Sequence, residues 1–310
     1  MIVRNRNDIY LLLQIDGAHK RRAMRRYRAG PRRCYNAAMN FNEPVILGRT
    51  GLKVGRLGIA SGLWAPAPAI EEAFERGCNY FTWGTFIRGR SPHMRDAIRT
   101  IVAKGQRERL VLSMFSYAHD PFLTEHFLAK GLKSINLDQA DILVLGFFSR
   151  RPSKRVLEGA LRLRDKGLVR FIGLSGHNRK LFPKLAEEGD FDVFHVRYNA
   201  AHRGAETETF PFIKGEKRPG VVTFTATKWR RLLTPKKMPP GETPPTAVDC
   251  YRFALSHPSV DVCLTGPKTL EQMRENLKIL DLGPLGKEES YRMRRIGDFV
   301  HGVKPAQPKA

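Results

Sequence analysis

Short apolar, β-branched runs alternate with amphipathic helical stretches from residue 56 to residue 280, and this alternation restricts the fold more than any other feature of the sequence. We expect eight strands, at residues 56–60, 78–81, 110–115, 141–145, 169–174, 192–197, 220–225 and 261–265. We expect eight helices between and after them, at residues 67–76, 92–104, 121–135, 153–166, 179–188, 206–214, 246–256 and 269–280. Eight strand–helix units over roughly 225 residues match the α/β class and a (β/α)8 TIM barrel.

A doubly wound parallel sheet is the alternative fold. It usually carries a Gly-rich phosphate turn after an early strand, and G-x-G-x-x-G is absent here. Residues 44–54, with a turn at 48–51, predict a short N-terminal hairpin that closes the bottom of the barrel. In such a barrel, chemistry belongs at the C-terminal ends of the strands.

The first 38 residues differ in composition from the rest. They hold ten Lys or Arg against Asp8 and Asp16, and so contribute a third of the net charge of +24. Three interpretations stay open: a targeting peptide, a nucleic-acid-binding arm, or upstream sequence that precedes the natural start. We therefore divide the chain into a basic extension, residues 1–38, and a barrel domain, residues 39–310. The charge favours polyanions in general and selects none, and we rank nucleic acid below a small phosphorylated molecule as partner.

Composition excludes several classes of protein. With 42% apolar residues, 18 Phe and three Trp, the chain can form a packed core. No apolar run approaches the roughly 20 residues of a membrane span, so we expect no membrane partner. The four cysteines lie far apart without metal-ligand spacing, which predicts reduced thiols, a cytoplasmic location and no metal. The oligomeric state stays open.

Several segments resemble the aldo-keto reductase family. They are LGRTGLKV and RLG within residues 47–58, GCNYF at 77–81, KGLVRFIGLS at 166–175, VRYN at 196–199 and TGPKTLEQMRENL at 265–277. The resemblance covers roughly residues 47–280 in order. It implies a barrel oxidoreductase that binds NADP(H) and transfers a hydride to or from a carbonyl or alcohol substrate.

The resemblance also implies a set of cofactor-binding residues. Ser175 and His195 match the positions that hold the nicotinamide carboxamide, and Phe224 matches the ring that stacks on the nicotinamide. Thr225, Lys228 and Arg230 begin the loop beside the pyrophosphate. The positions around the 2′-phosphate and adenine are matched by Gly266, Lys268, Gln272 and Asn276, and Lys268 favours NADP over NAD.

The catalytic positions depart from the family pattern. The family uses an Asp, a Tyr, a Lys and a His, and the Tyr protonates the carbonyl oxygen. The matching residues are Thr82, Ile87 (or Phe86), Phe115 (or Met114) and Gly146, so all four groups are missing. Candidate replacement donors near the barrel mouth are Tyr117 and His177, with His119, Tyr198 and His202 as further candidates.

Whether the chain is an enzyme therefore stays open in the sequence. One hypothesis is a reductase with an unusual proton donor acting on a small molecule that the sequence does not identify. The alternative is a catalytically inactive NADP(H)-binding protein that serves as a sensor or accessory module.

Overall fold

A computed structural model describes residues 40–60, 65–84 and 91–302 of this chain. Eight parallel strands form a closed barrel in the order β10-β3-β4-β5-β6-β7-β8-β9. Their bounds are β3 Leu57–Ala60, β4 Tyr80–Gly84, β5 Val111–Ser116, β6 Ala140–Leu145, β7 Val169–Gly176, β8 Val193–Arg197, β9 Gly220–Phe224 and β10 Val262–Thr265. The predicted (β/α)8 barrel is confirmed. The predictions for residues 1–38, Phe86 and Ile87 concern positions outside the described residues.

A two-stranded hairpin precedes the barrel, as predicted. Strands β1 (Val45–Ile46) and β2 (Lys53–Val54) pair antiparallel around the 3-10 turn η1 (Gly48–Thr50). Leu47, Leu52 and Val54 are buried and pack against the side chains that fill the barrel interior. The hairpin thus covers the end of the barrel at which the strands begin.

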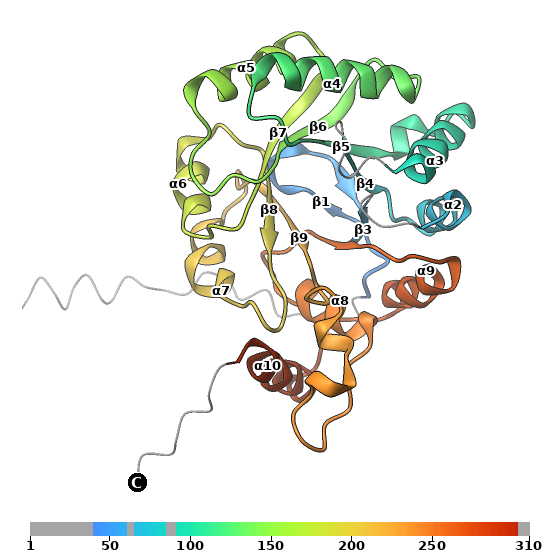
Figure 1. Ribbon diagram of the computed structural model, residues 1–310, viewed down its shortest axis with the longest axis vertical. Coiled ribbons are helices and arrows are strands. Elements are labelled where there is room, and N and C mark those ends of the chain that lie inside the picture. Colours follow the sequence, from blue (N-terminus) through green and yellow to red (C-terminus); the bar gives the residue numbers. More distant parts are fainter. Residues whose placement is uncertain (1–39, 61–64, 85–90, 303–310) are drawn as a thin grey trace, which may run out of the picture. The chain divides into compact units, whose positions relative to one another are not determined.

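Helices α2 to α9 surround the ring of strands in chain order, and α10 lies between α7 and α8 (Figure 1). Their bounds are α2 Ala67–Glu75, α3 Pro92–Ala103, α4 Pro121–Ser134, α5 Lys154–Asp165, α6 Leu181–Glu188, α7 Ala205–Glu208, α8 Ala247–Leu255, α9 Leu270–Leu277 and α10 Lys287–His301. Ser91, Asp120, Ser153, Thr246 and Thr269 begin five of them, and each side chain accepts a backbone N–H of the first turn.

The helix predicted at residues 206–214 is wrong in length. Helix α7 ends at Glu208, and a 3-10 turn, η3 (Phe210–Phe212), follows. The chain leaves the helical conformation at Thr209, with φ −132° and ψ −62°, and Pro211, which has no N–H to continue the α-helical ladder, lies in the 3-10 turn that follows. Helix α10 was not expected at all. No helix among the described residues is long and apolar enough to cross a membrane.

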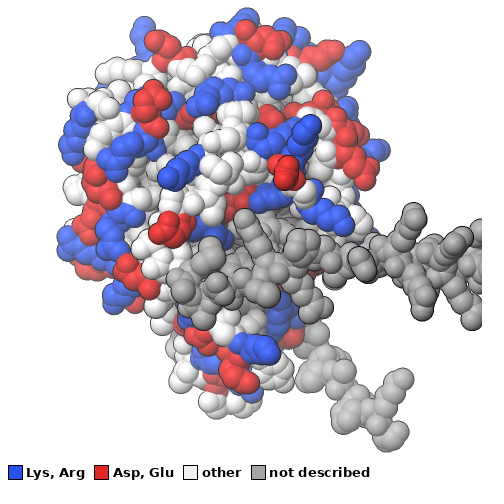
Figure 2. Space-filling view, turned by 180° about the vertical axis from the view of Figure 1, so that it is seen from behind, with Lys and Arg blue, Asp and Glu red and all other residues white. Residues whose placement is uncertain are grey.

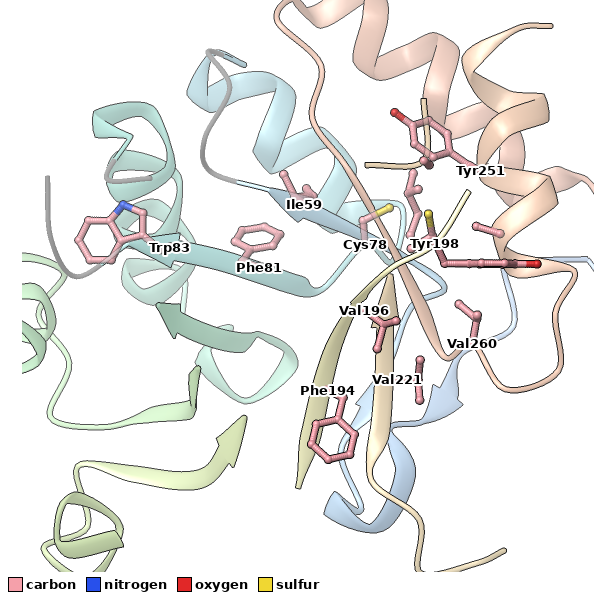
Figure 3. Close-up of a cluster of buried hydrophobic side chains, with 14 of the residues drawn as sticks. Ile59, Cys78, Phe81, Trp83, Phe194, Val196, Tyr198, Val221, Tyr251 and Val260 are labelled. Carbon is pink, nitrogen blue, oxygen red and sulfur yellow. The ribbon is translucent and has the colours of Figure 1, made fainter. Parts of the chain in front are cut away.

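Strict alternation along the strands separates two apolar clusters. One fills the barrel and consists of Tyr80, Val111, Phe115, Ile142, Val144, Val193, Val222, Val262 and Leu264, with the hairpin residues. The other lies between the strands and the helices and includes Phe81, Trp83, Phe194 and Val196 (Figure 3). Because successive side chains of a strand face opposite sides, odd and even positions can be assigned to the interior or the outer layer.

Candidate functional site

Partly exposed side chains face inward at the ends of four strands. Tyr117 follows β5, Ser175 and Arg197 lie near the ends of β7 and β8, and Phe224 ends β9. Arg197 pairs in register with Phe224, and Ser175 pairs with His195 one layer deeper. These residues form the mouth at which the fold class places its chemistry.

Three of the four predicted catalytic positions are described, and none offers an acid or a base. Thr82 is buried and donates to the Ile59 carbonyl at 3.4 Å. Phe115 faces the barrel interior, whereas Met114 lies in the outer layer against α4. Phe115 is therefore the inward residue at the position of the family lysine.

Gly146 has an unexpected neighbour. A Cβ at this position would lie 2.5 and 2.6 Å from Cδ1 and Cε1 of Tyr117. Real Cβ atoms do not approach another side chain so closely, so only glycine leaves room for the ring. Gly146, which the resemblance aligns with a histidine, thus provides the space that the Tyr117 ring occupies.

Aromatic side chains line the position of Tyr117. Its ring stacks on Phe147 with centroids 4.8 Å apart and is tilted against Phe115 at 5.8 Å. Burial raises the pKa of the Tyr117 hydroxyl. At neutral pH the hydroxyl is therefore protonated and able to donate.

A buried tyrosine–histidine pair lies deeper in the barrel. The Tyr80 hydroxyl and His195 Nε2 are 2.8 Å apart, and both side chains are shielded from solvent. Burial lowers the pKa of His195 to about 3, so the ring is neutral and its Nε2 can accept the Tyr80 proton. His195 Nδ1 is buried with no hydrogen-bond partner. The predicted cofactor role of His195 would require a ligand that reaches below the mouth.

The nicotinamide end of the predicted cofactor site is accessible. The Ser175 hydroxyl makes no hydrogen bond within the described part of the chain, and the side chain is partly exposed. Phe224 is also partly exposed, and the exposed ring of His177 meets it edge-on at 5.7 Å. Burial and the charge of Arg197 lower the pKa of His177, so it is neutral at pH 7.

The loop after β9 has an unusual backbone. Thr225, Lys228, Trp229 and Arg230 all have positive φ angles, between 49° and 65°. The Lys228 ammonium is buried and donates to the Val300 carbonyl of α10 at 2.9 Å. Left-handed conformations cost non-glycine residues free energy and concentrate at functional sites.

The adenosine end is only partly free. Gly266 is partly exposed and the Lys268 side chain is exposed. Gln272 accepts the Lys268 backbone N–H at 2.9 Å, and the buried Asn276 donates to Thr265 Oγ1 at 2.9 Å. Lys268 is thus the accessible cation of this group, and the cofactor roles of all four stay predictions.

The remaining candidate donors are less suited to the mouth. Tyr198 lies in the outer layer and donates to Glu206 at 2.7 Å (Figure 3). His119 Nε2 lies 3.0 Å from the Gly146 carbonyl oxygen. Burial, together with the charges of Arg197, Lys228, His301 and Arg179, lowers the pKa of His202 to about 4.

Sequence reasoning missed two residues, Tyr80 and Arg197. Tyr80 stands two positions before Thr82, and Arg197 two positions after His195, so both share the inward face of their strands. The alternation of inward- and outward-facing positions along each strand could have identified both residues from the sequence.

Comparison with known proteins supports the fold. No protein-family model matches the sequence, and no curated protein is similar to it. Among solved structures, the chain is similar to the aldo-keto reductase AKR11C1 from Bacillus halodurans. The holo form has a TM-score of 0.67 at 17% identity, covering 82% of this chain and 96% of the other. The apo form has a TM-score of 0.66 at 19% identity, covering 82% and 95%.

Proposed function

We propose that this chain is an NADP(H)-dependent oxidoreductase of the aldo-keto reductase type in which Tyr117 donates the proton to a carbonyl oxygen. The observation that carries the proposal is that the Tyr117 ring occupies the space that a side chain at position 146 would fill. The tyrosine of the family pattern is absent at Ile87, and a different strand end brings a tyrosine hydroxyl to the same mouth. The thiols of Cys78, Cys250 and Cys263 are buried and form no disulfide, and this favours the reducing cytoplasm as the location.

The accessible groups at the mouth fit a nicotinamide nucleotide. The free Ser175 hydroxyl can bond the carboxamide, and the flat face of Phe224 can support the ring. Lys268 can pair with a phosphate at the start of α9. When bound, the reduced cofactor supplies the hydride.

Tyr117 is expected to be a weaker acid than the family tyrosine. No lysine lies beside it at the Phe115 position, and burial raises rather than lowers the pKa of its hydroxyl. General acid catalysis contributes about 10²–10⁴-fold when the pKa lies near the working pH. We therefore expect slow turnover that still depends on the hydroxyl.

One observation favours the second candidate, an inactive NADP(H)-binding module. The described mouth holds no cation beside Tyr117 that could stabilise a phenolate, because its ring neighbours are Phe115 and Phe147. Such a protein would bind the cofactor without turnover.

Basic and acidic side chains are interspersed over the face shown in Figure 2, and this face does not favour a nucleic-acid partner.

The test uses the full chain and begins with cofactor binding. NADPH is titrated into wild type, Phe224→Ala and Lys268→Ala while tryptophan fluorescence is followed. Micromolar binding that both substitutions weaken by about tenfold or more is expected. Absence of binding in the folded wild-type protein would refute both candidate functions.

Turnover is then measured with Tyr117→Phe. A panel of aldehydes is mixed with excess enzyme and NADPH, and loss of NADPH absorbance is followed. We expect Tyr117→Phe to keep the NADPH affinity and to lower the rate by about 10²-fold or more. Gly146→Ala, which displaces the ring by overpacking, should lower the rate as well. Binding without turnover in wild type would establish the inactive module instead.

A further inference from the structure

Arg197 is a half-buried cation without a counterion. Its Nε is buried and has no hydrogen-bond partner, and the side chain makes no ion pair or hydrogen bond within the described residues. A guanidinium removed from water without compensation is costly. A group of this kind requires a functional explanation.

The other arginines show how unusual this is. Within the described ranges, every other arginine that is at least partly buried bonds a carboxylate or a backbone carbonyl. These are Arg49, Arg56, Arg95, Arg107, Arg179, Arg203, Arg218, Arg252, Arg292 and Arg294. Arg197 is the only arginine of this partly buried group without such a bond among the described residues. It is the last residue of β8, on the inward face of the strand at the mouth.

The two acidic side chains of helix α7, which follows Arg197 in the chain, are engaged with other groups. Glu206 accepts two hydrogen bonds from Arg294 and one from Tyr198, and Glu208 pairs with Arg179. Outside the described residues the sequence contains only two acidic side chains, Asp8 and Asp16. The segments 61–64 and 85–90, which follow β3 and β4, contain none.

Further positive or neutral donors surround the same position. Phe224, the strand partner of Arg197, carries His177 against its ring. The charge of Arg197 also lowers the pKa values of His177, His202 and Lys228, which shows that all three lie within its field. An anion placed here would meet a planar guanidinium and neutral imidazoles able to donate.

We propose that the substrate carries an oxyanion, a carboxylate or a phosphate, which Arg197 binds at the mouth beside Phe224. This assignment of substrate class rests on the proposed function, because the nicotinamide face offered by Phe224 defines where the reacting carbonyl lies. Guanidinium matches both oxyanions through two parallel hydrogen bonds, and the two terminal Nη groups of Arg197 bond nothing among the described residues. The anionic group anchors the substrate, and the carbonyl then extends toward Tyr117.

The first experiment needs no cofactor. Urea unfolding of the full chain is measured with increasing inorganic phosphate or succinate, and with chloride at the same ionic strength. Both oxyanions are expected to stabilise wild type and Arg150→Gln, an exposed-arginine control, by mass action. Arg197→Gln should lose the succinate response and part of the phosphate response, because Lys268 still offers a phosphate site, and Arg197→Lys should keep part of the succinate response. A wild-type response no greater than that to chloride, or an Arg197→Gln response equal to wild type, would overturn the proposal.

The unliganded variant gives an independent readout. Since Arg197 has no partner to lose, Arg197→Gln should unfold at the same or higher urea concentration than wild type. Arg203→Gln, which removes the ion pair with Asp298 and the bonds to the Ala200 and Arg294 carbonyls, should unfold at lower urea concentration. A large loss of stability in Arg197→Gln would mean a structural arginine and would count against an anion site.

Kinetics then separate the possible sources of the oxyanion. Succinic semialdehyde and butanal have similar chains, and only the first is anionic. Arg197→Gln should lower kcat/KM for succinic semialdehyde by about 10- to 100-fold and leave butanal unchanged. An equal effect on both aldehydes together with about tenfold weaker NADPH binding would assign the oxyanion to the cofactor and overturn the substrate assignment. Loss of the oxyanion response in Arg197→Gln, in a protein that binds no NADPH, would refute the proposed function and still support the anion site.

Discussion

Single residues inside the barrel determine how the protein responds to pH. His195 is neutral and buried against Tyr80, and protonation would place a charge in the barrel interior beside an orphaned Nδ1. The pKa of His195 is lowered to about 3, against an ordinary value of 6.5 in the unfolded chain. Below pH 6.5 the unfolded state therefore binds a proton that the folded state does not.

This difference predicts acid sensitivity. Stability from His195 is fully present above pH 6.5 and is lost as the pH falls toward about 3, by about 1.4 kcal/mol per pH unit. His195→Gln, which can still accept from Tyr80, should remove this part of the slope. The measurement is the free energy of unfolding in urea from pH 7 to pH 4 for both proteins. Parallel curves for wild type and variant would contradict the assignment.

At the scale of elements, the loop after β9 stores backbone strain. Lys228, Trp229 and Arg230 are consecutive left-handed residues, and Lys228 is fixed to α10 by its bond to the Val300 carbonyl. Each such residue costs about 1–2 kcal/mol relative to a right-handed conformation. Helix α10 thus holds a loop that faces the predicted cofactor site.

Trp229 allows the strain to be measured. Its side chain is 77% exposed, so its removal loses little packing. We expect Trp229→Gly to raise the free energy of unfolding by about 0.5–1 kcal/mol, because relief of strain exceeds the added entropy of the unfolded chain. Tyr291→Gly is the matched control, since Tyr291 is 67% exposed inside α10, and it should be destabilising. Circular dichroism in urea measures both, and destabilisation by Trp229→Gly would contradict the prediction.

At the scale of the whole molecule, a stabilising network lies at the end of the barrel opposite the proposed site. An Asn or Asp near the start of every second strand accepts a backbone N–H from the first half of the preceding strand or from the residues just before it. The four pairs are Asn79 with Gly55, Asp141 with Leu112, Asp192 with Ile172, and Asp261 with Val221. Each Asp also pairs with an arginine. These bonds fix neighbouring strands around the end of the barrel that the hairpin covers.

Asp261→Ala tests this division. Asp261 is 4% exposed, and its removal leaves Arg218 and the Val221 N–H without their partner. We expect a loss of about 3–5 kcal/mol in the free energy of unfolding, with unchanged ligand affinity at the mouth. Asp281→Ala, which breaks an exposed pair with Arg76, should cost under about 1 kcal/mol. Equal costs for the two variants in urea unfolding would show that the buried network adds nothing.

The sequence by itself determined the barrel, because strand and helix periodicities are local properties that eight successive units repeat. The hairpin and the strand positions follow from the same local signals, and the structure confirms them. The predicted helix at 206–214 was wrong in length, because the chain leaves the helical conformation at Thr209 and Pro211 lies in the 3-10 turn that follows, and α10 went unpredicted. That Thr82, Phe115 and Gly146 stand at the catalytic positions of the aldo-keto reductase pattern stays a prediction from the sequence.

Only the tertiary structure decided which side chains meet. Tyr117 fills the space of Gly146, and Tyr80 bonds His195, across 29 and 115 positions of the chain respectively. Arg197 makes no ion pair among the residues that the structure describes, and Glu206 and Glu208 in the following helix bond other arginines. Closing the sheet into a barrel places distant strand ends around one mouth, and the pairing of charges and the filling of space there depend on distances that local patterns do not encode.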